Sequence, residues 1–111
     1  MRTSSRDFVI VLFDEVELLD VAGVMQVASA AGRHWNWRPF RLLPAALQKG
    51  PIATRSQLRL EASVALADHP EPELLFVPGG YGARRAAADR ELVAWVARAA
   101  ARAELVCALG S

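Results

Sequence analysis

The chain has 111 residues, of which 53% are hydrophobic and 23% are charged. This balance is typical of a globular protein, and the length predicts a single domain over residues 1–111. The formal net charge is +1 and the arginines are scattered along the chain. The composition therefore argues against direct binding to nucleic acid or to an anionic membrane surface.

The hydropathy pattern predicts a cytoplasmic protein. Residues 8–13 are apolar but are followed at once by Asp14, which makes this run too short for the apolar core of a signal peptide. No apolar run approaches the roughly 20 residues that a membrane-spanning helix needs. The chain has one cysteine, so no internal disulfide can form, which suits a reducing compartment.

The first part of the chain predicts a buried strand, a helix and a second strand. Residues 8–13 form a continuous apolar, β-branched run that is typical of a parallel strand covered on both faces. Apolar residues then recur at helical spacing over 18–31, and Gly32 is expected to end this helix. Gly23 lies inside it at a cost of about 1 kcal/mol relative to alanine, which suggests close packing or a nearby ligand. A short strand is expected at 40–43.

The second part predicts a small β excursion, then a further strand, helix and strand. We expect Met25 and Trp95 to lie in the core and Asp89 to cap a helix. The expected elements are strand pieces at 52–54 and 58–60, a loop at 66–72, a strand at 74–77, a helical turn at 83–88, a helix at 90–102 and a strand at 104–109.

Alternating strands and helices predict an α/β fold with a mostly parallel sheet. The segment that follows the strand at 74–77 is the glycine corner, residues 78–82, with the sequence Pro-Gly-Gly-Tyr-Gly. A glycine-rich turn between a buried strand and a helix exposes backbone N–H groups, and such turns are common ligand sites in α/β proteins.

Three segments make the sequence similar to the DJ-1/PfpI superfamily. Residues 12–23 resemble the family's first strand, loop and helix start, residues 74–82 resemble its Pro-Gly-Gly corner, and residues 89–109 resemble the helix and strand that lead to its nucleophile. The nearest branches are isonitrile hydratase-like proteins and the N-terminal domains of AraC-type regulators. The resemblance implies a flavodoxin-like three-layer sandwich that is incomplete at its C-terminus.

The resemblance also implies roles for two residues. Asp20 matches the acidic residue that hydrogen-bonds the reactive cysteine, and Gly80 matches the residue whose backbone N–H helps to form the oxyanion hole. From the residues alone, the more common explanation of Asp20 is a polar residue at a helix start, and the family resemblance is what favours a role in the site. Gly80 can be a turn glycine and an oxyanion-hole donor at once, because the turn directs its N–H group.

The family's nucleophile position departs from the pattern, because it falls on Gly110, where the family has a cysteine. Ser111 then matches the small residue that follows. Cys107 lies three residues earlier within an apolar run, so we expect it to be a buried core cysteine. A thiol of lowered pKa needs a helix N-terminus or a nearby cation, which a position within a strand does not offer.

Other candidate sites are weaker. His34 and His69 fall in predicted loops, where we expect exposed side chains, and no residues have metal-ligand spacing. The glycine corner begins like a dinucleotide fingerprint, but Arg85 replaces its third glycine, which argues against NAD. Trp35 and Trp37 are expected to pack at a strand entrance or a dimer contact rather than to stack on nucleic acid.

These observations leave three hypotheses. The first is a catalytically degenerate DJ-1/PfpI domain without cysteine-dependent hydratase, glyoxalase or amidotransferase activity. The second is a domain of an AraC-type regulator that senses a small-molecule ligand or mediates dimerisation, and the third is a non-catalytic remnant that pairs with another chain. In each case we expect no cofactor and no metal, apolar surface exposed around the last strand, and a homodimer, another oligomer or a marginally stable protein.

Overall fold

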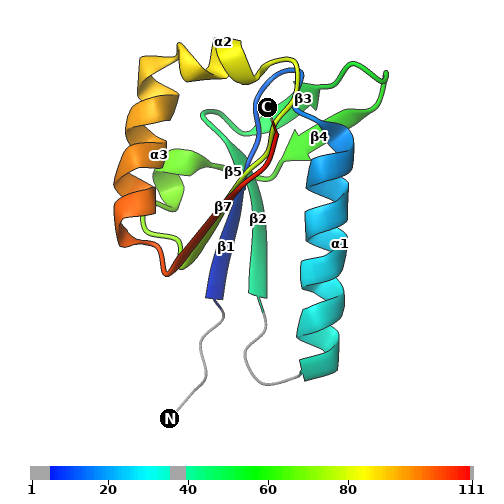
Figure 1. Cartoon of the computed structure of the whole chain (residues 1–111), viewed down its shortest axis with the longest axis vertical. Coiled ribbons are helices and arrows are strands. Elements are labelled where there is room, and N and C mark those ends of the chain that lie inside the picture. Colours follow the sequence, from blue (N-terminus) through cyan, green and yellow to red (C-terminus); the bar gives the residue numbers. More distant parts are fainter. Residues whose placement is uncertain (1–5, 36–39, 111) are drawn as a thin grey trace.

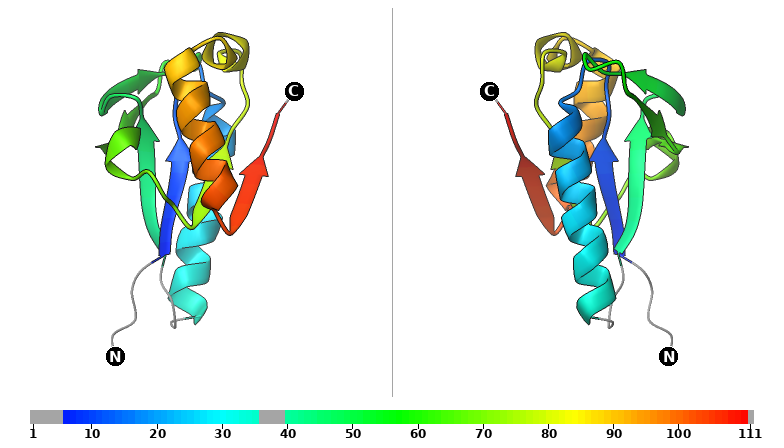
Figure 2. Two further views of the ribbon diagram at one scale, coloured as in Figure 1. Left: turned by 90° about the vertical axis from the view of Figure 1, so that its left-hand side faces the viewer. Right: turned by 90° about the vertical axis from the view of Figure 1, so that its right-hand side faces the viewer.

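The computed structural model of the chain describes residues 6–35 and 40–110. A five-stranded sheet forms the middle layer, with α1 on one face and α3 on the other, as the three views of Figures 1 and 2 show. The elements in chain order are β1 (Arg6–Val11), α1 (Leu18–Trp35), β2 (Phe40–Ala46), β3 (Gly50–Ala53), β4 (Arg59–Ala62), β5 (Val64–Ala65), the 3-10 turn η1 (Leu66–Asp68), β6 (Leu74–Val77), α2 (Ala83–Ala87), α3 (Arg90–Arg102) and β7 (Leu105–Ala108). The expected flavodoxin-like α/β sandwich is confirmed. No helix among the described residues is both long and apolar enough to cross a bilayer.

The sheet has the strand order β5-β2-β1-β6-β7, and each neighbouring pair of strands is parallel. From β1 the chain passes through α1 to β2 on one side, whereas β6 lies on the other side of β1. The crossover after β1 leads to β2 and the crossover after β6 leads to β7, in opposite directions from two neighbouring strands. Open α/β sheets bind ligands at the carboxyl edge where such a reversal occurs. The segments at 50–53 and 59–62, where the sequence predicted two short strand pieces, form an antiparallel hairpin, β3–β4.

Both faces of the sheet are buried at β1, which explains the continuous apolar run in this strand. Val9 and Val11 pack in the cluster that contains Trp95 of α3. Ile10 packs in the cluster on the opposite face, which contains Val21 of α1. Because successive side chains of a strand point to opposite faces, a strand covered twice must be apolar at every position.

Helix α3 begins and packs as the sequence predicted. The Asp89 Oδ1 atom accepts hydrogen bonds from the N–H groups of Glu91 and Leu92, at 3.0 and 3.2 Å. The side chain of Trp95 is 5% exposed, and its Nε1–H donates to the Leu66 carbonyl at 2.8 Å. This bond satisfies a polar group that would otherwise be costly to bury.

Three expectations about α1 are wrong. The helix continues through Gly32 to Trp35, so Gly32 does not end it and His34 lies in a helix rather than a loop. A glycine inside a helix costs only about 1 kcal/mol, which continued hydrogen bonding can offset. Gly23 is not a point of close packing, because an added Cβ atom would meet nothing within 4 Å. The expectation for Trp37 lies outside the described residues.

An ion pair joins β1 to β2 at the amino edge of the sheet. Arg41 donates from Nε and Nη2 to the Asp7 carboxylate at 2.9 and 3.2 Å, and His69 Nδ1 lies 3.6 Å from the same carboxylate. The side chain of His69 is 17% exposed, so the expectation of an exposed loop histidine is wrong. The hydrogen bonds from Arg41 hold the pKa of Asp7 below its ordinary value.

The substitution Asp7→Asn should therefore reduce stability in a pH-dependent way. A carboxyl whose pKa is lowered by folding stabilises the protein above its unfolded pKa, and this contribution is lost as the pH falls through the folded pKa. We expect the substitution to lower the urea midpoint clearly at pH 7 and far less at pH 3. Asp68→Asn, at an exposed position, is the matched control. Equal losses at the two pH values would contradict the assignment.

Candidate functional site

The candidate site lies where the glycine corner meets the loop after β1. Two backbone hydrogen bonds join these segments. Glu17 N–H donates to the Gly79 carbonyl at 2.9 Å, and Gly82 N–H donates to the Glu15 carbonyl at 3.1 Å. The loop after β1 and the glycine corner are thus held together at the carboxyl edge of the sheet.

Glycine is required at two positions of this corner. Gly80 has a φ of +127°, and a Cβ atom there would lie 2.5 Å from the Glu17 backbone nitrogen. A Cβ atom at Gly82 would lie 1.8 Å from the Asp14 carbonyl oxygen. Both contacts are with backbone, so a side chain could be admitted only by moving one loop away from the other.

Asp20 lies in the first turn of α1 and is directed to the corner. Its Oδ2 atom accepts a hydrogen bond from Gly79 N–H at 3.3 Å. The carboxylate therefore bridges α1 and the Pro-Gly-Gly turn, and it lies beside the residue that the sequence singled out as an oxyanion-hole donor. Its catalytic role stays a prediction.

Gly110 lies directly against the corner. It has a φ of +107°, and an added Cβ atom would lie 2.6 Å from the Gly79 Cα atom. The preceding residue, Leu109, donates its N–H to the Val77 carbonyl at 3.0 Å, which continues the pairing of β7 with β6 up to the turn. The structure thus brings Asp20, Gly80 and Gly110 together around Gly79, although the sequence separates them widely.

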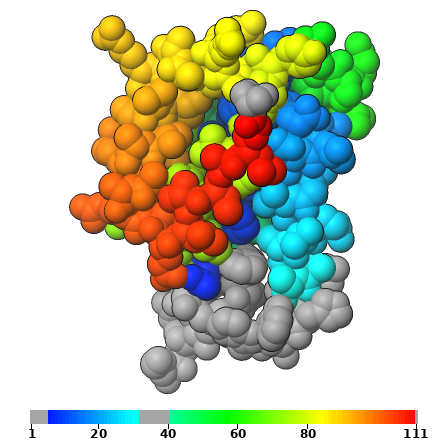
Figure 3. All heavy atoms as spheres, viewed as in Figure 1, coloured from blue at the N-terminus to red at the C-terminus, as the bar shows by residue number. Residues whose placement is uncertain are grey.

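Cys107 is exposed, so the expectation of a buried core cysteine is wrong. Its strand β7 is the edge of the sheet and lies on the surface between α3 and α1 (Figure 3). In the described part of the chain, all four residues of β7 are exposed, Leu105 by 56%. The expectation of apolar surface around the last strand is thereby confirmed. Cys107 pairs with Phe76, which places it about 10 Å along the strand from the corner.

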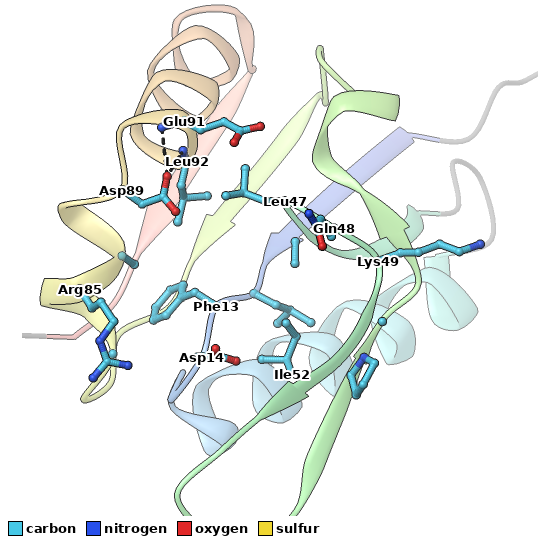
Figure 4. A pocket seen from close by; sticks show the side chains of 16 residues that line it. Phe13, Asp14, Leu47, Gln48, Lys49, Ile52, Arg85, Asp89, Glu91 and Leu92 are labelled. Carbon is cyan, nitrogen blue, oxygen red and sulfur yellow. Dashed lines mark hydrogen bonds between the residues drawn. The ribbon is translucent and has the colours of Figure 1, made fainter.

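A cleft of about 530 Å³ opens on the other side of the corner (Figure 4). Its walls come from the loop after β1, the segment between β2 and β3, and the helices α2 and α3. This cleft could not be predicted from the sequence, because its lining residues lie far apart in the chain and form no motif. Among the residues that the structure describes, no group of three His, Cys, Asp or Glu side chains could hold a metal ion.

Neither a scan against models of protein families nor a search of curated proteins finds a match. Solved structures do match. A THiJ/PfpI family protein from Pseudomonas syringae superposes with a TM-score of 0.80 at 18% identity, over 96% of this chain and 42% of that one. The chain has the DJ-1/PfpI fold. A mutant of a DJ-1 superfamily protein from Salmonella typhimurium gives a TM-score of 0.74 at 19% identity, over 96% of this chain and 56% of the other.

The DJ-1/PfpI fold also occurs in a regulator. An AraC family transcriptional regulator from Pseudomonas putida matches with a TM-score of 0.66 at 19% identity, over 92% of this chain and 55% of the other. The chain spans about half the length of these solved structures. At such identities the comparison establishes the fold, and activity has to be argued from the site.

The contacts at the corner predict a large penalty for Gly82→Ala. The added methyl group would overlap the Asp14 carbonyl, so we expect the free energy of unfolding to fall by about 3 kcal/mol. Gly23→Ala is the matched control, since it meets open space in a helix and should raise stability by up to about 1 kcal/mol. Urea unfolding measures both. A Gly82→Ala variant as stable as the wild type would contradict the geometry.

The exposure of Cys107 predicts ready modification of the folded protein. We expect an aromatic disulfide reagent to react with Cys107 at neutral pH about as fast as with a free model thiol, because no unfolding is needed. The rate is followed by absorbance at increasing urea concentrations below the unfolding transition. A slow reaction that accelerates with urea would show that the thiol is buried.

Proposed function

We propose that this chain is a DJ-1/PfpI superfamily domain that binds a small molecule at the glycine corner without cysteine-dependent catalysis. The observation that carries the proposal is Gly110. It lies against Gly79, whose N–H bonds Asp20, and it has no side chain with which to attack a ligand. Position 110 is also where the family resemblance places the nucleophile.

Nucleophilic catalysis needs a thiol or hydroxyl group within reach of the reacting carbon, together with donors for the developing oxyanion. The corner offers backbone N–H donors, whereas the position to which the family resemblance assigns the nucleophile is Gly110, which has no side chain. Cys107 lies three residues before Gly110, about 10 Å along the strand direction from it, and pairs with Phe76 rather than with Gly79. No covalent intermediate with a cysteine is therefore expected.

The groups that remain suit reversible binding of a small polar molecule. Among the described residues, the Gly80 N–H has no hydrogen-bond acceptor, so it can donate to a ligand carbonyl. The Asp20 carboxylate, which is already bonded to Gly79 N–H, has remaining lone pairs for a ligand N–H or O–H. A compound that carries a carbonyl oxygen next to an N–H donor matches both groups.

A second candidate function is the ligand-sensing or dimerisation domain of an AraC-type regulator. It is favoured by the structural match to the AraC family regulator from Pseudomonas putida. A sensor needs binding and no turnover, so the glycine at position 110 is compatible with this role. The reading frame downstream of residue 111 tests it, because a helix-turn-helix pair encoded there would support a regulator.

Turnover assays test the absence of cysteine chemistry. We expect wild-type protein and the variant Cys107→Ser to convert neither methylglyoxal nor an alkyl isonitrile above the buffer rate, since neither protein has a thiol at the corner. Product is measured by chromatography over several hours. Conversion by the wild type that Cys107→Ser abolishes would overturn the proposal.

Binding at the corner is tested with acetamide, whose carbonyl and amide groups complement Gly80 and Asp20. We expect acetamide to shift the backbone amide resonances of Gly79 and Gly80 in nitrogen–proton correlation spectra. Asp20→Asn should reduce the size of these shifts at a given acetamide concentration about fivefold, because a charge-assisted hydrogen bond is lost. Asp68→Asn should leave the shifts unchanged. Shifts confined to other parts of the protein would count against the corner as the binding site.

A further inference from the structure

Two neighbouring cavities share part of their walls. The cleft of about 530 Å³ and a second cavity of about 270 Å³ are both lined by Phe13, Ala86 and Leu92. In Figure 4, Leu92 points from α3 toward Leu47 across the cleft, and Phe13 lies below them. The two spaces therefore adjoin one another beside α2 and the start of α3.

The smaller cavity is apolar throughout. It lies between the ends of β1 and β6 and the helices α2 and α3, and each of its lining residues is an alanine, valine, leucine, phenylalanine or proline. The helices contribute small side chains, such as Ala83 and Ala97, which leave the space unfilled. At about 30 Å³ for each water-sized group, it has room for roughly nine heavy atoms.

The larger cleft presents negative charge. Asp14 and Glu91 line it, and among the described residues neither carboxylate has a hydrogen-bond or ion-pair partner. The positive groups are less available. Arg85 Nη2 lies 3.9 Å from Glu15 Oε1, and Figure 4 shows Lys49 extending away from the cleft.

We propose that the joined cavities form a binding site for a small organic amine with an apolar body. The apolar group fills the alanine- and valine-lined cavity, and the ammonium group lies in the cleft on the side of Asp14, whereas Glu91 lies at the opposite end of the cleft in Figure 4. Such a division, with a mostly apolar lining and a few polar groups that fix orientation, is typical of small-molecule sites. The corner residues Gly82 and Pro78 border the cleft and the cavity, but none of Asp20, Gly79 and Gly110 lines either space, so the amine site adjoins the corner and does not use the groups proposed to bind there.

Three probes of similar shape and different charge test the site: 2-phenylethylammonium, 2-phenylethanol and 3-phenylpropionate. We expect titration calorimetry at low salt to show that affinity falls in that order, with the amine binding about fivefold more tightly than the alcohol. Asp14→Asn should remove the preference for the amine over the alcohol. Asp68→Asn, an exposed aspartate outside the cavities, should preserve it.

Filling the junction tests the location. Ala86→Leu should abolish binding of the amine and the alcohol alike, whereas Ala101→Leu, on the exposed side of α3, should leave it intact. If Ala86→Leu proves unfolded by circular dichroism, Ala97→Leu fills the same cavity from α3. Equal affinity for the three probes, no binding at about 10 mM, or full binding by folded cavity-filled variants would each overturn the proposal. None of these outcomes affects the acetamide response at the corner.

Discussion

The site depends on the backbone contact between the loop after β1 and the glycine corner. Two hydrogen bonds join Glu17 to Gly79 and Gly82 to Glu15, and glycines alone permit the approach. Strands β1 and β6 are parallel neighbours, with Ile10 opposite Phe76, so they end at the same edge of the sheet and the loops that follow them lie side by side. This contact fixes the position of the Gly79 N–H group, to which α1 brings the Asp20 carboxylate.

Much of the fold could be predicted from the sequence because strong local signals coincide with the elements. The apolar run of β6, the Asp89 cap and the amphipathic pattern of α3 each have a physical cause within a few residues. The two-residue strand β5 has none, since it is defined only by pairing with β2. Strand β2 continues through Pro44 to Ala46. Proline is uncommon inside strands, and for that reason the strand predicted from the sequence ended at residue 43.

The parts of the candidate site that lie within sequence motifs could be predicted, and the parts that lie outside them could not. The resemblance placed Asp20, Gly80 and Gly110 in one site, and the structure brings them together. The exposure of Cys107 was missed because an apolar strand sequence does not reveal whether a neighbour covers it, and β7 is an edge in the described sheet. The two adjoining cavities were missed for a related reason, since they arise from packing between distant segments.

The central claim is the proposal that the corner binds a small molecule reversibly and does not react with it covalently. Intact-mass spectrometry tests this most directly, with the native protein held in an excess of an alkyl isonitrile and sampled over time. The account predicts an unmodified mass at every time point, because Gly110 offers no nucleophile to the ligand. An adduct that forms and decays during turnover, and that maps to the corner or to Cys107, would contradict it.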